Sequence, residues 1–303
     1  KYLRPDLVQT WLVHADFIGS ISAKLAGIKK IVWNIRYSNI EIGKAKLTTI
    51  LIIKVLSFIS HFIPKYIFVV SKKAKKIYKI EGYSKKKLIY IPNGYDLSIL
   101  KTDNVLKKKF REKIKVDRKI FLIGNVARYD PQKDHLNLIK ALALLNLKKI
   151  KFFCVLVGSN IDKKNNELIS KIKKFKLSKK IKLLGQCKNI NEIMNGLDLH
   201  ILSSSYGEGF PNVVAEAMAC GTPNVVTDVG DSSYIVGNTG WKVKPNDHIK
   251  LAKAIEKSLD EIGTAKWNRR CKNARLRIRN KFSINLMIDI YISIWKKVLK
   301  NRK

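Results

Sequence analysis

The chain alternates short apolar segments with longer segments in which apolar residues recur at helical spacing. Several short segments are apolar at every position, which is typical of parallel strands buried on both faces. The longer segments predict helices, for example over residues 15–26, 136–145, 165–175 and 213–220. Strands are predicted over residues 7–11, 30–35, 66–70, 88–91, 120–126, 152–157, 181–184, 199–202, 224–227 and 240–243. This alternation predicts an α/β fold with doubly wound, Rossmann-like sheets.

Two domains are expected, since 303 residues suffice for two domains of ordinary size. Turn-forming residues concentrate at Pro92-Asn93-Gly94-Tyr95-Asp96, and a lysine-rich helix is predicted shortly after them. We therefore place a first domain over 1–103 and a second over 104–281, with a C-terminal helix within 282–303. The sequence begins with Lys1 and enters a strand pattern at once, without a visible signal peptide. We therefore expect the first domain to be incomplete.

The formal net charge is +38, from 61 Lys and Arg against 23 Asp and Glu. One interpretation is an anionic partner, either nucleic acid or a membrane surface. The other is that lysine fills solvated faces without a specific role. The lysines are spread along the whole chain, and no region interleaves them with aromatic residues as a nucleic-acid site would. The sequence favours the second interpretation, with attraction to anionic lipid as a side effect.

The four cysteines, at positions 154, 187, 220 and 271, lie far apart and form no C-x-x-C pair. Neither a zinc site nor a disulfide framework is indicated, and no Asp-x-Asp follows a strand. We therefore predict no metal site and no cofactor. Isolated cysteines fit a reducing compartment, so we expect a cytoplasmic protein.

No apolar run reaches the roughly 18 residues of a membrane span. The nearest, residues 47–63, is interrupted by Lys54 and His61 and is followed by Pro64. This segment fits either an interfacial amphipathic helix or a core helix before the next strand. The greater frequency of core helices favours the second interpretation.

A serine- and glycine-rich loop follows the predicted strand 199–202, and a helix then begins near Pro211 and ends at Gly221. The backbone of Gly209-Phe210-Pro211-Asn212-Val213 is expected to present N–H groups at the carboxyl edge of a sheet, where ligands bind in open α/β folds. Two carboxylates, Glu208 and Glu216, flank this position. Carboxylates accept hydrogen bonds from sugar and ribose hydroxyls, so the pattern indicates a sugar nucleotide rather than a simple anion.

The pattern Glu-Gly-Phe-Pro-Asn-x-x-x-Glu-Ala-x-Ala-x-Gly-x-Pro, which starts at Glu208, resembles glycosyltransferase family 4, the retaining enzymes of the GT-B fold. The resemblance implies that Glu208 contacts donor sugar hydroxyls and that Glu216 holds the ribose. It also implies two Rossmann-like domains, with the last helix returning to the first. Without this context, two glutamates eight residues apart would be ordinary surface charges.

A second cluster follows the predicted strand 120–126 and contains Arg128 and Lys133. A guanidinium and a lysine at this spacing can straddle a diphosphate, and they resemble the Arg and Lys pair that supports the leaving group in the family. His135 stands where the family commonly has glycine, and we interpret it as a packing variation. By resemblance, the strand-end turns at Gly158 and Cys187 approach the diphosphate and the nucleotide base.

The first domain carries weaker matches, at His14 and at Arg36 in Trp33-Asn34-Ile35-Arg36-Tyr37-Ser38. Arg36 takes a place where the family commonly has histidine, as in some bacterial surface-polysaccharide enzymes. We treat both residues as candidates for the acceptor side. A histidine such as His14 more often packs in a core or starts a helix.

The resemblance implies a retaining hexosyltransferase in which Glu208, Arg128 and Lys133 are the catalytic residues, and the lack of a metal-binding pattern predicts that it is metal-independent. It is expected to move a hexose or N-acetylhexosamine from a UDP- or GDP-sugar to a growing, lipid-linked surface glycan such as O-antigen or capsule. The expected partners are a nucleotide sugar, a glycan acceptor and the inner face of the plasma membrane, without nucleic acid. Alternatives are another GT-B enzyme (a nucleotide-sugar epimerase or an inverting transferase), or a basic module that binds nucleic acid or membrane.

Overall fold

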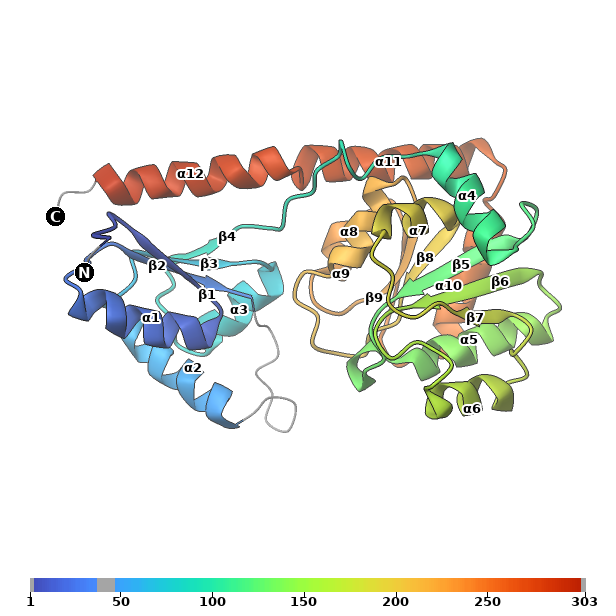
Figure 1. Cartoon of the computed structure of the whole chain (residues 1–303), viewed down its shortest axis with the longest axis horizontal. Helices are drawn as coiled ribbons and strands as arrows, with labels where there is room; N and C mark the ends of the chain where they lie inside the picture. Colours follow the sequence, from blue (N-terminus) through green and yellow to red (C-terminus); the bar gives the residue numbers. More distant parts are fainter. Residues whose placement is uncertain (1–2, 37–46, 301–303) are drawn as a thin grey trace. The chain divides into compact units, whose positions relative to one another are not determined.

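The computed structural model describes residues 3–36 and 47–300 (Figure 1). The chain forms two compact units. The N-terminal unit comprises residues 1–94, 207–210 and 284–303, and the C-terminal unit comprises residues 95–206 and 211–283. The predicted positions Tyr37 and Ser38 lie outside the described residues.

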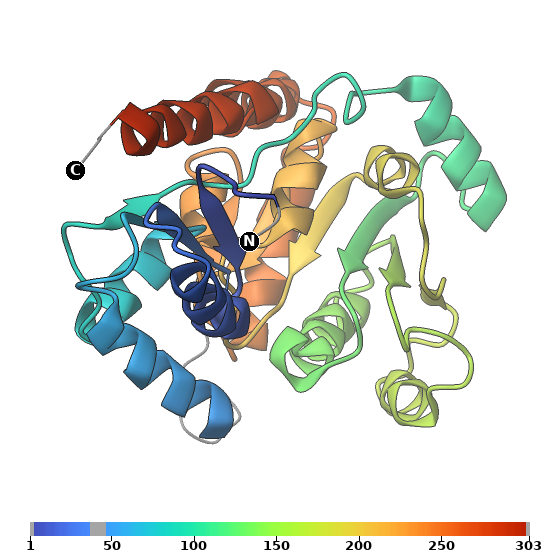
Figure 2. The ribbon, with the colours of Figure 1, turned by 60° about the vertical axis from the view of Figure 1, so that its left-hand side comes forward.

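The N-terminal unit contains a parallel four-stranded sheet in the order β1-β2-β3-β4. Helices α1, α2 and α3 pack on one face of this sheet through a shared core, and α12 packs on the opposite face (Figure 2). All five residues of β2 are buried, as its uninterrupted apolar character predicts. The elements are β1 (Val8–Trp11), α1 (Val13–Leu25), β2 (Ile31–Ile35), α2 (Leu47–Ile59), β3 (Tyr66–Val69), α3 (Lys72–Ile80), β4 (Leu88–Tyr90) and α12 (Ile284–Lys300).

The C-terminal unit contains a parallel six-stranded sheet in the order β10-β9-β8-β5-β6-β7. The chain leaves β5 in one direction through β6 and β7, then returns to the other side of β5 with β8. This reversal is the switch point at which open α/β sheets hold ligands, beyond the carboxyl ends of the strands. Its strands are β5 (Phe121–Val126), β6 (Phe152–Val157), β7 (Ile181–Leu183), β8 (Leu199–Leu202), β9 (Asn224–Thr227) and β10 (Trp241–Val243).

Helices connect these strands and cover the sheet around an apolar core. The helices are α4 (Asn104–Ile114), η1 (Pro131–Lys133), α5 (His135–Leu147), α6 (Asn166–Lys174), α7 (Ile190–Gly196), α8 (Asn212–Ala219), α9 (Ser232–Val236), α10 (His248–Leu259) and α11 (Ala265–Lys281).

The α/β fold with two parallel, Rossmann-like sheets is confirmed. Each of the ten predicted strands is present, with ends that differ by one residue at most. The units divide after Gly94, before the predicted end of the first domain at residue 103. A physical reason is visible at Arg275 of α11, whose guanidinium donates to the carbonyls of Leu97 (3.1 Å) and Leu100 (2.7 Å) and so ties this segment to the C-terminal unit.

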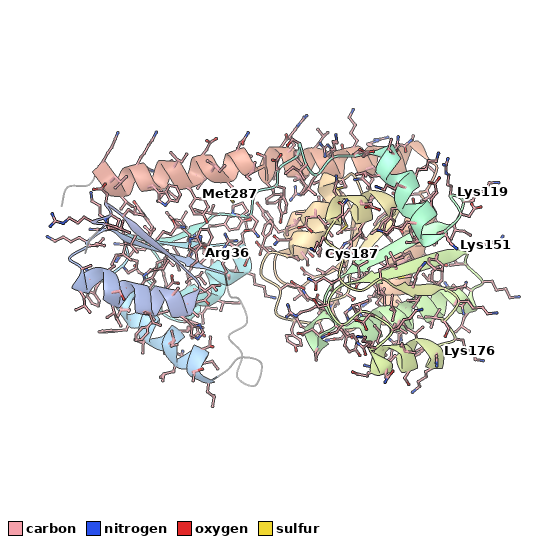
Figure 3. The ribbon with its side chains drawn as sticks, viewed as in Figure 1. Arg36, Lys119, Lys151, Lys176, Cys187 and Met287 are labelled. Carbon is pink, nitrogen blue, oxygen red and sulfur yellow. The ribbon has the colours of Figure 1, made fainter. Side chains whose placement is uncertain are left out.

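Two further features bear on the sequence interpretation. No helix of the described residues is long and apolar enough to cross a membrane. Lysines such as Lys119, Lys151 and Lys176 are exposed and point outward from the C-terminal unit (Figure 3), as the solvated-face interpretation requires.

Candidate functional site

Backbone hydrogen bonds join the strand-end loops at the carboxyl edge of the six-stranded sheet. The Tyr129 N–H, in the loop after β5, donates to the Ser159 carbonyl in the loop after β6 (2.9 Å). The Gly158 N–H donates in turn to the Gly185 carbonyl in the loop after β7 (2.8 Å). Since these bonds involve the main chain, they position the loops without requiring particular polar side chains. The edge is therefore a preformed platform at the switch point of the sheet.

The loop after β8 joins the same platform through η1. The Ser203 hydroxyl donates to the Lys133 carbonyl (2.8 Å), and the Ser205 N–H donates to the Gln132 carbonyl (2.9 Å). Ser203 is fully buried, so its hydroxyl needs this partner. The backbone that carries Lys133 is thereby held against the loop that leads to the Glu208 motif.

Arg128 lies in the loop after β5, and its side chain is 57% exposed. Its guanidinium donates to the Asp130 carboxylate (3.1 Å) and to the Gln132 side chain (3.3 Å). Burial disfavours the charged form of Asp130, but the Gln132 N–H and Arg128 outweigh it and lower the pKa of this carboxyl. Arg128 is thus oriented by neighbours on its own loop, while most of its surface faces solvent.

Gly158 explains why this loop can approach the next one so closely. A Cβ at this position would lie 2.1 Å from the Ala127 carbonyl oxygen and 2.9 Å from the Arg128 nitrogen. Its φ of +151° also belongs to a region that favours glycine. Gly158 therefore lets the Arg128 loop pack on the end of β6, while its role near the diphosphate stays a prediction.

Helix α8 carries Glu216, and burial raises the pKa of that carboxyl. Pro211 is the N-cap of α8, with an extended backbone (ψ 103°), so the helix begins near Pro211 as predicted. The Asn212 side chain accepts a hydrogen bond from the Tyr95 hydroxyl (2.8 Å). Gly221 ends the helix with φ +80°, and its N–H donates to the Met218 carbonyl (3.0 Å).

The Glu208 motif is divided between the two units of the fold. Glu208, Gly209 and Phe210 belong to the segment 207–210 of the N-terminal unit, whereas Pro211 onward belongs to the C-terminal unit. Within the C-terminal unit the structure brings Arg128, Lys133 and Gly158 to one sheet edge, with Asn212, Val213 and Glu216 on the helix after β8. The roles of these residues stay predictions.

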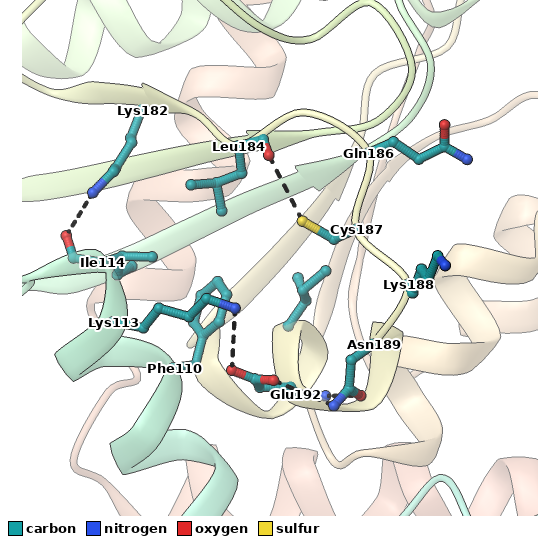
Figure 4. A pocket seen from close by; sticks show the side chains of 11 residues that line it. Phe110, Lys113, Ile114, Lys182, Leu184, Gln186, Cys187, Lys188, Asn189 and Glu192 are labelled. Atoms are coloured by element: carbon teal, nitrogen blue, oxygen red, sulfur yellow. Dashed lines mark hydrogen bonds and ion pairs between the residues drawn. The ribbon is translucent and has the colours of Figure 1, made fainter.

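A pocket of about 490 Å³ lies at the β7 edge of the C-terminal unit (Figure 4). Of the predicted site residues, it includes Cys187, whose thiol contacts the Leu184 carbonyl (3.8 Å). Arg128, Lys133 and Gly158 do not line it. The pocket is therefore distinct from the predicted diphosphate position and shares with it only the loop after β7. Its lining comes from Phe110, Lys113, Ile114, Lys182, Leu184, Gln186, Cys187, Lys188, Asn189, Glu192 and Ile193.

In the N-terminal unit, the two acceptor-side candidates follow neighbouring strands. Arg36 directly follows β2, and its guanidinium lies over the Trp11 ring (4.7 Å) and donates to the Asn93 side chain. Figure 3 shows Arg36 within this unit. His14 is exposed in the first turn of α1, so it is a helix-start residue and not a core histidine. Both side chains belong to the carboxyl edge of the four-stranded sheet.

Sequence reasoning missed a buried acid beside these candidates. Asp16 is fully buried in α1 and accepts a hydrogen bond from the Thr10 hydroxyl (2.5 Å). Burial raises its pKa to about 7, against the opposing effects of Thr10 and the Asn34 backbone. The turn before it is also unusual, because Leu12 adopts φ +77°. The sequence feature that could have revealed Asp16 was an acidic residue in the first helical turn after a strand.

Sequence reasoning also missed one buried polar residue of the C-terminal unit, Asn125, and interpreted another, His135, only in part. Asn125 in β5 is buried and donates to the Ile201 carbonyl (2.9 Å), which ties β5 to β8 at the switch point. His135 is buried beside the Tyr129 ring (5.4 Å), and its ring nitrogens have no hydrogen-bond partner among the described residues. Burial lowers the pKa of His135 to about 4. This arrangement agrees with the packing role predicted for it.

Residues 3–36 and 47–300 bring together no group of three His, Cys, Asp or Glu side chains that could hold a metal ion. The absence of a metal requirement in the reaction stays a prediction.

Comparison with known proteins decides the family. The model described as "Glycosyl transferases group 1" matches residues 106–277, more than half of the chain. The chain belongs to this glycosyltransferase family. The match covers β5 to α11 and includes Arg128, Lys133, Glu208 and Glu216. It thereby confirms the resemblance on which the site was predicted.

Two curated relatives of this group 1 glycosyltransferase have named activities. The Escherichia coli UDP-Gal:alpha-D-GlcNAc-diphosphoundecaprenol alpha-1,3-galactosyltransferase is 27% identical over 98% of this chain and 76% of its own length. A Campylobacter jejuni alpha-N-acetylgalactosaminyltransferase, named for a diphospho-undecaprenol acceptor, is 32% identical over 48% of this chain and 36% of its own.

Solved structures share the fold. Anabaena HepE in complex with UDP-glucose superposes with a TM-score of 0.84 at 22% identity, over 96% of this chain and 79% of HepE. A Rickettsia africae glycosyltransferase gives 0.77 at 22% identity, over 95% and 82% of the two chains. At this identity the likeness concerns the fold, and it agrees with the predicted GT-B architecture.

Proposed function

We propose that this glycosyltransferase transfers a hexose or N-acetylhexosamine from a UDP- or GDP-sugar to a lipid-linked glycan, with retention of anomeric configuration. The observation that carries the proposal is the platform at the carboxyl edge of the six-stranded sheet, where the loop of Arg128 and Lys133 is bonded to the loop after β8. The names of the relatives support the substrates, since both act on acceptors linked to diphosphoundecaprenol. UDP is favoured as the carrier, because the Escherichia coli relative is named for UDP-Gal.

The transfer reaction places two requirements on the donor site. Charge that develops on the leaving diphosphate must be neutralised, and a guanidinium with a lysine five residues later suits that task. Arg128 is half exposed and oriented by Asp130, so it can exchange part of this pairing for phosphate oxygens. The sugar must also be oriented through its hydroxyls, which carboxylates accept well; this is the role proposed for Glu208. Glu216 would hold the ribose.

Donor binding is tested by thermal shift against a panel of UDP- and GDP-sugars, since a ligand that binds the folded state raises its melting temperature. Arg128→Gln and Lys133→Gln should each weaken binding about tenfold to a hundredfold. Lys163→Gln, at an exposed lysine of the same unit, is the matched control and should bind like the parent. A panel in which no nucleotide sugar raises the melting temperature would overturn the donor proposal.

Transfer is tested with a radiolabelled donor and a lipid diphosphate-linked N-acetylhexosamine acceptor. Glu208→Gln should reduce transfer by at least about a hundredfold, because removal of one aligned hydrogen-bond partner typically has this effect in active sites. Glu112→Gln, at an exposed glutamate, is the control. Nuclear magnetic resonance of the product gives its anomeric configuration. Inversion would contradict the retaining mechanism and favour an inverting GT-B enzyme, and interconversion of donor sugars without transfer would favour an epimerase.

A further inference from the structure

The pocket at the β7 edge of the C-terminal unit has the size of a small-molecule site, at about 490 Å³. Its lining is partly apolar, with Phe110 and Ile114 from α4 and Leu184 from the end of β7 (Figure 4). Three kinds of polar group lie among these side chains: a carboxylate, a thiol and several ammonium groups. This combination suits a ligand that carries complementary charges and can react with a thiol.

Glu192 of α7 supplies the carboxylate, and its side chain is only 10% exposed. One oxygen, Oε2, accepts a hydrogen bond from the Asn189 side chain (3.2 Å). The other, Oε1, has no hydrogen-bond partner among the described residues, and the Lys113 ammonium lies 3.9 Å from it. Buried carboxylate oxygens are normally paired, because leaving one unpaired is costly. Glu192 therefore indicates a donor, such as an ammonium, that a ligand would bring.

Cys187 supplies the thiol, and it differs from the other three cysteines in its exposure. Cys154 and Cys220 are buried and Cys271 is half-buried, whereas Cys187 is exposed and lines the pocket. Burial raises the pKa of the Cys220 and Cys271 thiols to about 12 and about 11. It thereby lowers their fraction of thiolate, the form that attacks a disulfide. Cys187 is thus the cysteine that a reagent in solution can reach.

The ammonium groups of the pocket come from three lysines. Lys113 is 69% exposed, and Lys188, which directly follows Cys187, is exposed as well. Lys182 donates to the Ile114 carbonyl (3.2 Å). Cations in excess of a single carboxylate attract a ligand that has more carboxylates than ammonium groups. Glutathione has this pattern of charge, with two carboxylates and one ammonium, and it also carries a thiol.

We propose that this pocket binds a disulfide of a low-molecular-weight thiol of the glutathione type and joins one half of it to Cys187 as a mixed disulfide. The Cys187 sulfur attacks one sulfur of the small disulfide. An S–S bond to Cys187 forms, the original S–S bond breaks, and the second thiol leaves with the proton that Cys187 gives up. Lys113 and Lys188 pair with the carboxylates of the bound half, and Glu192 pairs with its ammonium. A thiol reverses the modification.

The mixed disulfide lowers the affinity for the donor, and this consequence rests on the proposed function. Cys187 lies two residues after Gly185, whose carbonyl accepts the Gly158 N–H of the platform (2.8 Å). The resemblance to the family brings the turn at Cys187 close to the nucleotide base. A thiol held there occupies space beside the base.

Mass spectrometry of the full chain, incubated with glutathione disulfide, tests the site without any donor. Peptide mapping should place one glutathione on Cys187, at a rate at least about tenfold above that of Cys271. Neutral hydroxyethyl disulfide is the comparison, and each rate is divided by that of the same disulfide with an unstructured cysteine peptide. Cys187 should then prefer glutathione disulfide at least about tenfold. No mixed disulfide at Cys187, or equal normalised rates for the two disulfides, would overturn the proposal.

Glu192→Gln separates recognition of the ligand from attraction by the net charge of +38. This variant keeps an acceptor oxygen for Asn189 but loses the carboxylate, so the reaction with glutathione disulfide should slow about fivefold to tenfold. The reaction with hydroxyethyl disulfide should change less than about twofold, since that ligand has no ammonium. General attraction requires the opposite result, a faster reaction with glutathione disulfide, because the variant is more basic. That result would overturn the proposal.

A charge-matched pair of variants tests the lysines of the pocket. Lys113→Gln/Lys188→Gln should slow the reaction with glutathione disulfide about fivefold to tenfold. Lys253→Gln/Lys257→Gln, at exposed positions of α10 outside the pocket, loses the same charge and should change the rate less than about twofold. Equal effects of the two pairs would contradict a specific site.

Thermal shift measures the consequence for the donor. The chain modified at Cys187 should bind the nucleotide sugar at least about tenfold more weakly, and dithiothreitol should restore the affinity. Cys187→Ser should bind the donor equally with and without glutathione disulfide. An unchanged affinity of the modified chain would contradict the link to the donor. If the untreated chain bound no nucleotide sugar, the proposed function would fail, while the mass and the rates at Cys187 would still decide the site.

Discussion

The carboxyl edges of the two parallel sheets are built in different ways. In the C-terminal unit, main-chain hydrogen bonds join the strand-end loops, and Gly158 permits their close approach. In the N-terminal unit the Leu12 N–H also donates to the Asn34 carbonyl (3.0 Å), but side chains add the connections Thr10 with Asp16 and Arg36 with Asn93. A sheet edge joined through the backbone can be recognised in the sequence by its glycines and loop motifs. A sheet edge joined through side chains is marked only by isolated polar residues. This difference explains why the donor-side residues could be predicted with roles and the acceptor-side residues only as candidates.

The two units are also expected to respond to pH in opposite directions. Buried Asp16 keeps its proton in the N-terminal unit up to about pH 7. Buried His135 and His200 of the C-terminal unit stay neutral down to about pH 4, because burial disfavours their charged forms. Raising the pH should therefore weaken the first unit, and lowering it should weaken the second.

The largest combined effect, on stability and on donor binding together, is expected from Gly158→Ala, which tests whether the backbone platform depends on close approach. A Cβ 2.1 Å from the Ala127 carbonyl oxygen forces the Arg128 loop away, so the variant should lose about 3 kcal/mol or more of unfolding free energy together with donor binding. Gly185→Ala is the matched control, since its φ is also positive but its nearest neighbour is 4.0 Å away. It should lose only about 1 kcal/mol. Equal losses in urea unfolding would show that strain, and not close approach, sets the requirement.

The next effect concerns Asp16 in the N-terminal unit. The folded pKa of about 7 lies above the usual 3.8, so the folded state holds a proton that the unfolded chain releases. This contribution to stability is complete below about pH 4 and is lost as the pH rises through 7, by up to about 4 kcal/mol. Asp16→Asn should remove this pH dependence.

Urea unfolding read by hydrogen exchange of a β2 peptide, at about pH 5 and pH 8, reports this unit separately. The exposed Asp6→Asn is the control and should behave like the parent. If the stability of Asp16→Asn still depends on pH in this way, another titrating group is responsible.

The smallest effect is expected for His135→Leu in the C-terminal unit. The folded pKa of about 4 lies below the usual 6.5, so stability is complete above pH 6.5 and falls as the pH drops toward 4. In the parent at about pH 5, His135 gains a proton on unfolding, and this favours the unfolded state. The leucine variant has no such group and should be more stable than the parent by about 1–2 kcal/mol. The pH dependence should be reduced rather than abolished, since buried His200 remains.

Hydrogen exchange of a β5 peptide measures this effect, with the half-exposed His248→Leu as control. A variant less stable than the parent at every pH would show that the imidazole contributes packing that leucine cannot replace.

The sequence by itself determined the strands, since each is a short run rich in apolar residues, and the central ones are apolar at nearly every position, as burial on both faces requires. It also identified the family and predicted the donor-side positions, because the Glu208 motif and the Arg128 loop are contiguous stretches of chain. Only the tertiary structure determined which side chains are buried or hydrogen-bonded where separate elements of the fold meet. Asp16 is buried because α1 packs on β1 and β2, where Thr10 and the Asn34 backbone contact it. Ser203 holds the Lys133 backbone because the return of the chain through β8 brings together residues 70 positions apart. The sequence also left open whether α2 is a core helix or an interfacial helix, because its apolar residues do not show whether neighbouring elements cover one side of the helix or both.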